Sequence, residues 1–63
     1  MKRKTVANLR DILAELEKVR AQVQETILLE ELGGNEGGYL EHLLTLRDGI
    51  DCNILFVTKL RTL

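Results

Sequence analysis

Apolar residues recur at every third or fourth position in two segments of this chain, which a short glycine-rich break separates. In the first segment the spacing runs from Val6 to Ile27, and in the second from Tyr39 to Leu60. This spacing places the apolar side chains on one side of a helix. The pattern therefore predicts an all-α fold. The predicted elements are a helix at about 5–32, a loop at 33–38 and a helix at about 39–61.

Two residues mark the expected ends of the first helix. Thr5 has a hydroxyl that can cap the first turn, and Gly33 can adopt the left-handed conformation that often ends a helix. A chain of 63 residues has no room for a third long element after these two. We therefore expect one domain, residues 1–63, folded as an antiparallel helical hairpin.

A hairpin of this size has few ways to stabilise itself. Cys52 is the only cysteine, so no disulfide can form within the chain. His42 is the only histidine, so a Cys/His zinc site cannot be completed by one chain. Domains this short usually need a disulfide, a metal or a partner chain. Self-association into a homo-oligomer is therefore the expected source of stability.

The apolar stripe of the first helix is wider than a two-stranded coiled coil needs, and the end of the second helix is apolar on all sides. Both features are typical of a helix bundle. We expect two hairpins to dimerise into an antiparallel four-helix bundle. The residues expected at the oligomer interface are Leu9, Ile12, Leu16, Val19, Val23, Leu28, Leu29, Ile50, Ile54, Leu55, Phe56 and Val57.

Charge is distributed unevenly, although the formal net charge is only −1. No lysine or arginine occurs between Ala21 and Leu46, whereas glutamates are frequent there. Folding at the glycine loop brings the basic residues together at the other end of the hairpin. An antiparallel dimer would place this basic end against the acidic loop end of its partner. The basic residues, which are also the candidate contacts for an anion or nucleic acid, are Lys2, Arg3, Lys4, Arg10, Lys59 and Arg61.

A row of small residues follows the second helix: Thr45, Gly49 and Cys52. Glycine inside a helix costs about 1 kcal/mol relative to alanine. Such a row would allow another helix to approach closely, or Gly49 is simply tolerated on an exposed face. Both interpretations remain open at the level of sequence. For Cys52 itself we expect the role of a small buried hydrophobic residue.

No catalytic constellation is visible in the sequence. His42 stands alone, and the pattern favours a solvated surface histidine. Asp48 and Asp51 lie three residues apart on one helical face, but without a third ligand they indicate a solvated acidic face rather than a metal or acid–base site. We therefore expect no enzymatic activity, no bound cofactor and no metal.

The architecture and length are similar to those of plasmid-encoded RNA-binding hairpins that dimerise into four-helix bundles, with scattered shared positions such as Cys52 and Phe56. The chain also resembles phage-encoded helical hairpins that sequester cyclic nucleotides as oligomers, with Tyr39 opening the second helix and Gly49 within it. Neither resemblance includes a binding motif. The first implies RNA binding, and the second implies a small anionic ligand held between subunits.

These observations predict a small regulatory or adaptor protein that self-associates and acts by binding a macromolecular partner, most simply another protein. Two alternatives remain: an RNA- or DNA-binding bundle that uses the basic end, and an oligomer that binds a small anion between subunits. The longest aliphatic or aromatic run, Ile54 to Val57, is far shorter than the roughly 20 residues of a membrane span. With an unpaired thiol and no charged-then-apolar leader, we expect a cytoplasmic protein.

Overall fold

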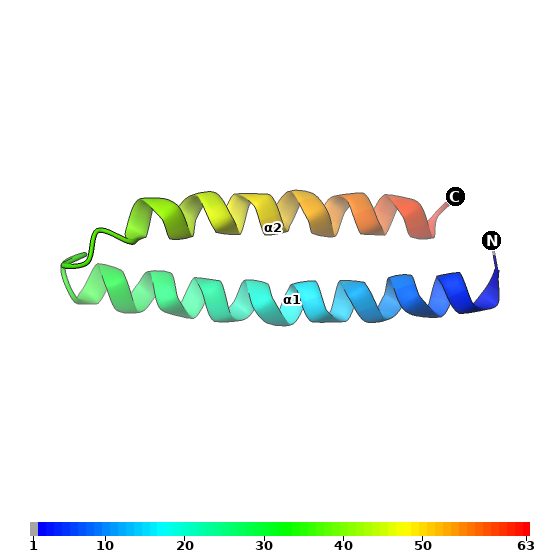
Figure 1. Ribbon diagram of the computed structural model, residues 1–63, viewed down its shortest axis with the longest axis horizontal. Coiled ribbons are helices and arrows are strands. Elements are labelled where there is room, and N and C mark those ends of the chain that lie inside the picture. Colours follow the sequence, from blue (N-terminus) through cyan, green and yellow to red (C-terminus); the bar gives the residue numbers. More distant parts are fainter. Residues whose placement is uncertain (1) are drawn as a thin grey trace.

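The computed structural model describes residues 2–63 and consists of two antiparallel α-helices joined by a short loop (Figure 1). Helix α1 spans Arg3–Leu32 and helix α2 spans Leu40–Arg61. Both chain ends lie at one end of the hairpin, and the loop lies at the other. The prediction of an all-α helical hairpin is therefore confirmed.

Helix α1 begins two residues earlier than predicted. Its N-cap is Lys2, whose side chain makes no capping hydrogen bond, and the carbonyl of Lys2 accepts a bond from the N–H of Val6 at 3.1 Å. The prediction that Thr5 caps the helix is wrong, because Thr5 lies inside the first turn. Arg3 and Lys4 are good helix formers, so nothing in their backbone preferences stops the helix before Thr5.

Helix α1 ends in a Schellman motif whose left-handed residue is Gly34, with φ of 76°. The N–H of Gly34 donates to the carbonyl of Glu31 at 3.3 Å, and the N–H of Asn35 donates to the carbonyl of Glu30 at 2.8 Å. The prediction that Gly33 is left-handed is wrong, since its φ is −82°. The conformational freedom of glycine is used one residue later, at Gly34.

The loop also provides the cap for α2. The N-cap position of this helix is Tyr39, so α2 begins one residue later than predicted. Asn35 adopts a left-handed conformation with φ of 56°, and its side-chain Oδ1 accepts a hydrogen bond from the N–H of Leu40 at 3.0 Å. Asparagine tolerates this conformation better than other residues that have a side chain. One loop residue thus makes the turn and satisfies a free donor of the next helix.

The hydrophobic core lies between the two helices, in the half of the hairpin nearer the loop. Ile27 is the most buried side chain, 1% exposed, and it forms one cluster with Val23 and Ile50. Val57 is buried further toward the chain ends, and all four buried residues belong to the apolar stripes that the sequence shows. Other hydrophobic residues pack at the edge of the cluster: Leu40, Leu43, Leu44 and Ile54.

Candidate interaction surfaces

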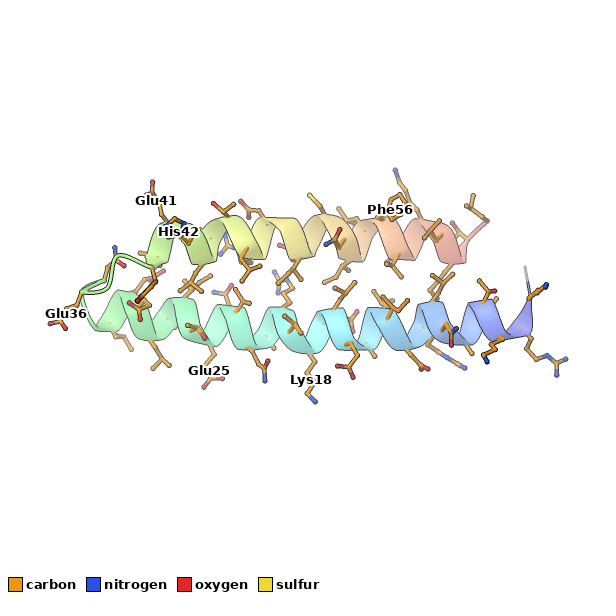
Figure 2. All side chains as sticks on the ribbon, viewed as in Figure 1. Lys18, Glu25, Glu36, Glu41, His42 and Phe56 are labelled. Atoms are coloured by element: carbon orange, nitrogen blue, oxygen red, sulfur yellow. The ribbon has the colours of Figure 1, made fainter. Side chains whose placement is uncertain are left out.

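Many large hydrophobic side chains are not covered by the hairpin. In the described residues 2–63, eleven large hydrophobic residues are exposed and only four hydrophobic residues are buried. Phe56 is 61% exposed and points away from α1 (Figure 2). A single helix pair covers one stripe of each helix, so the wider apolar surface noted in the sequence stays in contact with solvent.

The residues predicted at the oligomer interface fall into three groups. Val23, Ile50 and Val57 are buried within a single chain and belong to the core of the hairpin. The half-buried group is Leu9, Leu16 and Ile54. The exposed group is Ile12, Val19, Leu28, Leu29, Leu55 and Phe56.

An apolar depression of about 320 Å³ lies on α1 itself. Ile12, Leu16 and Val19 line it, and Asp11 and Glu15 form its polar border. Ile12 is 47% exposed and Val19 is 40% exposed. Since every lining residue belongs to α1, this part of the predicted stripe lies beyond the cover that α2 provides.

The small residues of α2 lie on the surface of the hairpin. Thr45, Gly49 and Cys52 are all exposed. A Cβ atom added to Gly49 would meet no atom within 4 Å outside its own helix backbone, so α1 does not require glycine there. The expectation that Cys52 is buried is wrong, because its thiol is free and exposed.

An ion pair joins the two helices near the middle of the hairpin. The Nε of Arg20 donates a hydrogen bond to the Oδ1 of Asp51, and both side chains remain partly exposed. This hydrogen bond, and then the charge of Asp51, raises the pKa of Arg20 above its ordinary value. The pair borders a depression of about 500 Å³ that is also lined by Glu17, Ile54 and Leu55.

Sequence reasoning missed this pair, although a signal for it was present. Folding the chain at the glycine loop places residues of α1 beside residues of α2 so that the sum of the two residue numbers stays nearly constant, and this register sets Arg20 opposite Asp51. Asp48 and Asp51, which the sequence places on one helical face, contact different arginines. Asp51 is bound to Arg20, whereas Asp48 lies 3.7 Å from a guanidinium nitrogen of Arg47.

Three of the predicted basic residues come together at the open end of the hairpin. Arg3 and Arg10 from α1 and Arg61 from α2 line a depression of about 410 Å³. Its remaining lining residues are Val6 and Ala7, so its surface combines guanidinium groups with small apolar side chains. The three lysines of the same group lie outside this lining but are also exposed: Lys2, Lys4 and Lys59.

Metal-ligating side chains do not form a cluster in the part of the chain that the structure describes. His42 is exposed, and within residues 2–63 no group of three or more His, Cys, Asp or Glu side chains is close enough to hold a metal ion. No buried side-chain nitrogen or oxygen in that range lacks a hydrogen-bond partner. Neither α1 nor α2 combines the length and the hydropathy that a membrane crossing requires.

Comparison with protein-family models, with curated proteins and with solved structures finds no match to this chain. The class that the structure itself defines is a two-helix antiparallel hairpin with an uncovered apolar surface and an arginine-lined open end.

Proposed function

We propose that the protein self-associates as an antiparallel dimer, forming a four-helix bundle, and acts as a small non-enzymatic regulatory or adaptor protein that binds another protein. The observation that carries this proposal is the imbalance between eleven exposed large hydrophobic residues and four buried ones in the described chain. Exposed apolar side chains that lie together, as Ile12 and Val19 do in the depression on α1, are typical of an interaction surface. A second copy of the same chain is always available to cover this apolar surface.

The shape of the hairpin supports the same proposal. Its radius of gyration is 14.7 Å and its extents are 48 × 14 × 12 Å. A compact domain of this length would have a radius of gyration of about 11 Å. Each helix therefore packs only against the other helix of the hairpin. Neither helix has a second layer of structure against which to bury its remaining apolar side chains.

Charge favours the antiparallel arrangement. The loop end contains Glu30, Glu31 and Glu36, and the opposite end contains the arginine-lined depression. Two hairpins that run in opposite directions would place each acidic end beside a basic end. A parallel pair would bring like charges together, which costs free energy.

The exposed, unpaired thiol of Cys52 supports a reducing location for this assembly. A free surface cysteine in an oxidising compartment would be open to disulfide formation with other chains. We therefore propose that the protein acts in the cytoplasm.

Sedimentation equilibrium at micromolar concentrations tests the proposed assembly. We expect a dimer whose melting temperature rises with protein concentration, because association stabilises the folded chain by mass action. A folded monomer with a melting temperature independent of concentration would refute the proposal. Mass spectrometry of proteins that co-purify from the native host then tests the adaptor role, and Phe56→Ser provides the matched variant with one exposed apolar side chain removed.

Binding of RNA or DNA is the second candidate function. The convergence of Arg3, Arg10 and Arg61 at one end favours it, since arginine clusters contact phosphates. The chain has no tryptophan and one tyrosine, so it absorbs little at 280 nm. A high ratio of absorbance at 260 nm to that at 280 nm in purified protein would therefore reveal bound nucleic acid, and nuclease treatment would lower that ratio.

A further inference from the structure

The arginine-lined depression is built by both helices of one chain. Arg3 and Arg10 lie seven residues apart on α1, which places them on the same side of that helix, two turns apart. Arg61 reaches the depression from the last turn of α2. The three residues line one depression because the hairpin brings the start of α1 beside the end of α2 (Figure 1).

None of the three arginines forms an ion pair within the described residues 2–63. The lining includes no aspartate or glutamate, and the ion pairs in residues 2–63 are those of Arg20 with Asp51 and Arg47 with Asp48. The first turn of α1 contains no acidic residue either. The positive end of the α1 dipole lies here beside the negative end of the α2 dipole, so the local field comes mainly from the guanidinium groups, which repel one another. An anion bound among them would relieve this repulsion.

The size and composition of the depression indicate which kind of anion fits. Its volume of about 410 Å³ lies in the range of small-molecule sites, which is about 300 to 1,000 Å³. Guanidinium groups bind phosphate through paired, parallel hydrogen bonds. Val6 and Ala7 provide an apolar surface beside them, where the organic part of a ligand can pack.

We infer that this depression binds a small phosphate ester of about the size of a mononucleotide. Arg10 and Arg61 hold the phosphate from the two helices, Arg3 adds charge at the start of α1, and Val6 and Ala7 contact the organic group. Free phosphate shares the same charged chemistry but would leave the apolar surface unused. All lining residues belong to one chain, so the inference goes beyond the proposed self-association.

Calorimetric titration at low salt tests the inference with four probes: adenosine monophosphate, adenosine, inorganic phosphate and a short single-stranded RNA. We expect adenosine monophosphate to bind, adenosine not to bind, and inorganic phosphate to bind more weakly than the ester. Arg10→Gln should weaken binding of the ester by about tenfold, because hydrogen bonds to charged groups contribute most of the affinity. The same titration with Arg61→Gln should show a loss of similar size.

Lys18→Gln is the matched control. It removes the same charge, but Lys18 projects from α1 away from α2 and outside the depression (Figure 2). We expect it to change the affinity by less than about twofold, the size of a long-range screened effect. An equal loss in Lys18→Gln and Arg10→Gln would overturn the inference, because it would show non-specific attraction rather than a site.

Three other outcomes have fixed meanings. Equal affinity for phosphate and the ester would overturn the assignment of an ester, because Val6 and Ala7 would then add nothing to binding. No binding of either probe would overturn the inference. Binding of the RNA alone would also overturn it, and would support the nucleic-acid function instead. Sedimentation of each variant is measured in parallel, so a failure of self-association is recognised separately from a failure of ligand binding.

Discussion

The side-chain Oδ1 of Asn35 accepts a hydrogen bond from the backbone N–H of Leu40 at 3.0 Å, so the loop caps the helix that follows it. Asn35 also has a left-handed backbone, and its own N–H donates to the carbonyl of Glu30 at 2.8 Å. One residue therefore contacts the end of α1 and the start of α2. The direction in which α2 leaves the loop depends on this residue.

Asn35→Ala should destabilise the hairpin by about 1 to 2 kcal/mol. The substitution removes the cap, and alanine tolerates the left-handed backbone conformation less well than asparagine does. Asn35→Gly is the matched control, since it removes the same cap but keeps the backbone freedom. Urea unfolding followed by circular dichroism gives both free energies. If the two variants were equally stable, the left-handed conformation of residue 35 would not contribute.

Ile27→Ala should have the largest cost of any alanine substitution in the chain, about 3 to 5 kcal/mol, because Ile27 is only 1% exposed. Ile50→Ala should cost slightly less, since Ile50 is 6% exposed at the edge of the same cluster. Leu16 is half-buried and should fall below both, and Gln22→Ala should be nearly silent. Unfolding of the four variants at one protein concentration checks this order, and a reversed order would mean that the helical faces are assigned incorrectly.

The ion pair between Arg20 and Asp51 should contribute modestly and in a salt-dependent manner. Asp51→Ala should lower the melting temperature at low ionic strength and have less effect at about 1 M salt, because the pair is partly exposed. A raised arginine pKa means that Arg20 keeps its charge throughout the neutral and mildly alkaline range, so the effect should not change between about pH 7 and about pH 9. Asp48→Ala is the control, because Asp48 pairs only with its neighbour Arg47. An equal effect of both substitutions would show that the inter-helix pair has no special role.

The sequence was sufficient to predict the two helices and the hairpin, because the apolar spacing on either side of one glycine break has few other solutions. It was not sufficient to predict the helix ends. Gly33 and Gly34 are both able to be left-handed, and only the register of the final hydrogen bonds selects Gly34. Thr5 has a side chain that can cap a helix. The arginine and lysine before it favour the helical conformation, however, so the helix extends past Thr5 toward the N-terminus.

The candidate surfaces were predicted less well, for a geometric reason. A stripe of residues shows which side of α1 is apolar but not how much of it one partner helix covers, so Val23 and Ile12 could not be told apart. They are in fact 7% and 47% exposed. The basic residues were recognised as a group, but the distinction between the arginines that line the depression and the lysines that do not depends on side-chain direction.

Gly49→Ala should have opposite effects on the stability of the single hairpin and on the strength of its self-association. An added Cβ meets open space within the single chain, so alanine should strengthen α2 itself by about 1 kcal/mol. We expect it nevertheless to weaken self-association, because a helix of a second chain that packs closely over the small residues Thr45, Gly49 and Cys52 has no room for the methyl group. Sedimentation and thermal melting are measured on the same samples. A more stable variant with unchanged self-association would show that Gly49 is only tolerated at an exposed position.

Charge reversal tests the antiparallel orientation of the proposed dimer. If the basic end of one chain lies beside the loop end of the other, the double substitution Lys59→Glu and Arg61→Glu should weaken the dimer, because it places like charges together. Adding Glu30→Lys and Glu31→Lys to the same chain should restore it, since both ends are then reversed. Exposed pairs contribute little individually, so the expected change in dissociation constant is about threefold to about a hundredfold, and larger at low salt.

The same variants distinguish the dimer from a nucleic-acid site at the basic end. If Lys59 and Arg61 serve nucleic acid, their reversal should leave the dimer intact and abolish a salt-sensitive affinity for a labelled RNA. The reversal at Glu30 and Glu31 would then fail to restore RNA binding, because it moves positive charge to the other end of the hairpin. Restored dimerisation in the fourfold variant would support the antiparallel arrangement, since no parallel pairing brings residues 59 and 61 beside residues 30 and 31. If the dissociation constant were the same in all variants, the charge asymmetry would have no part in self-association.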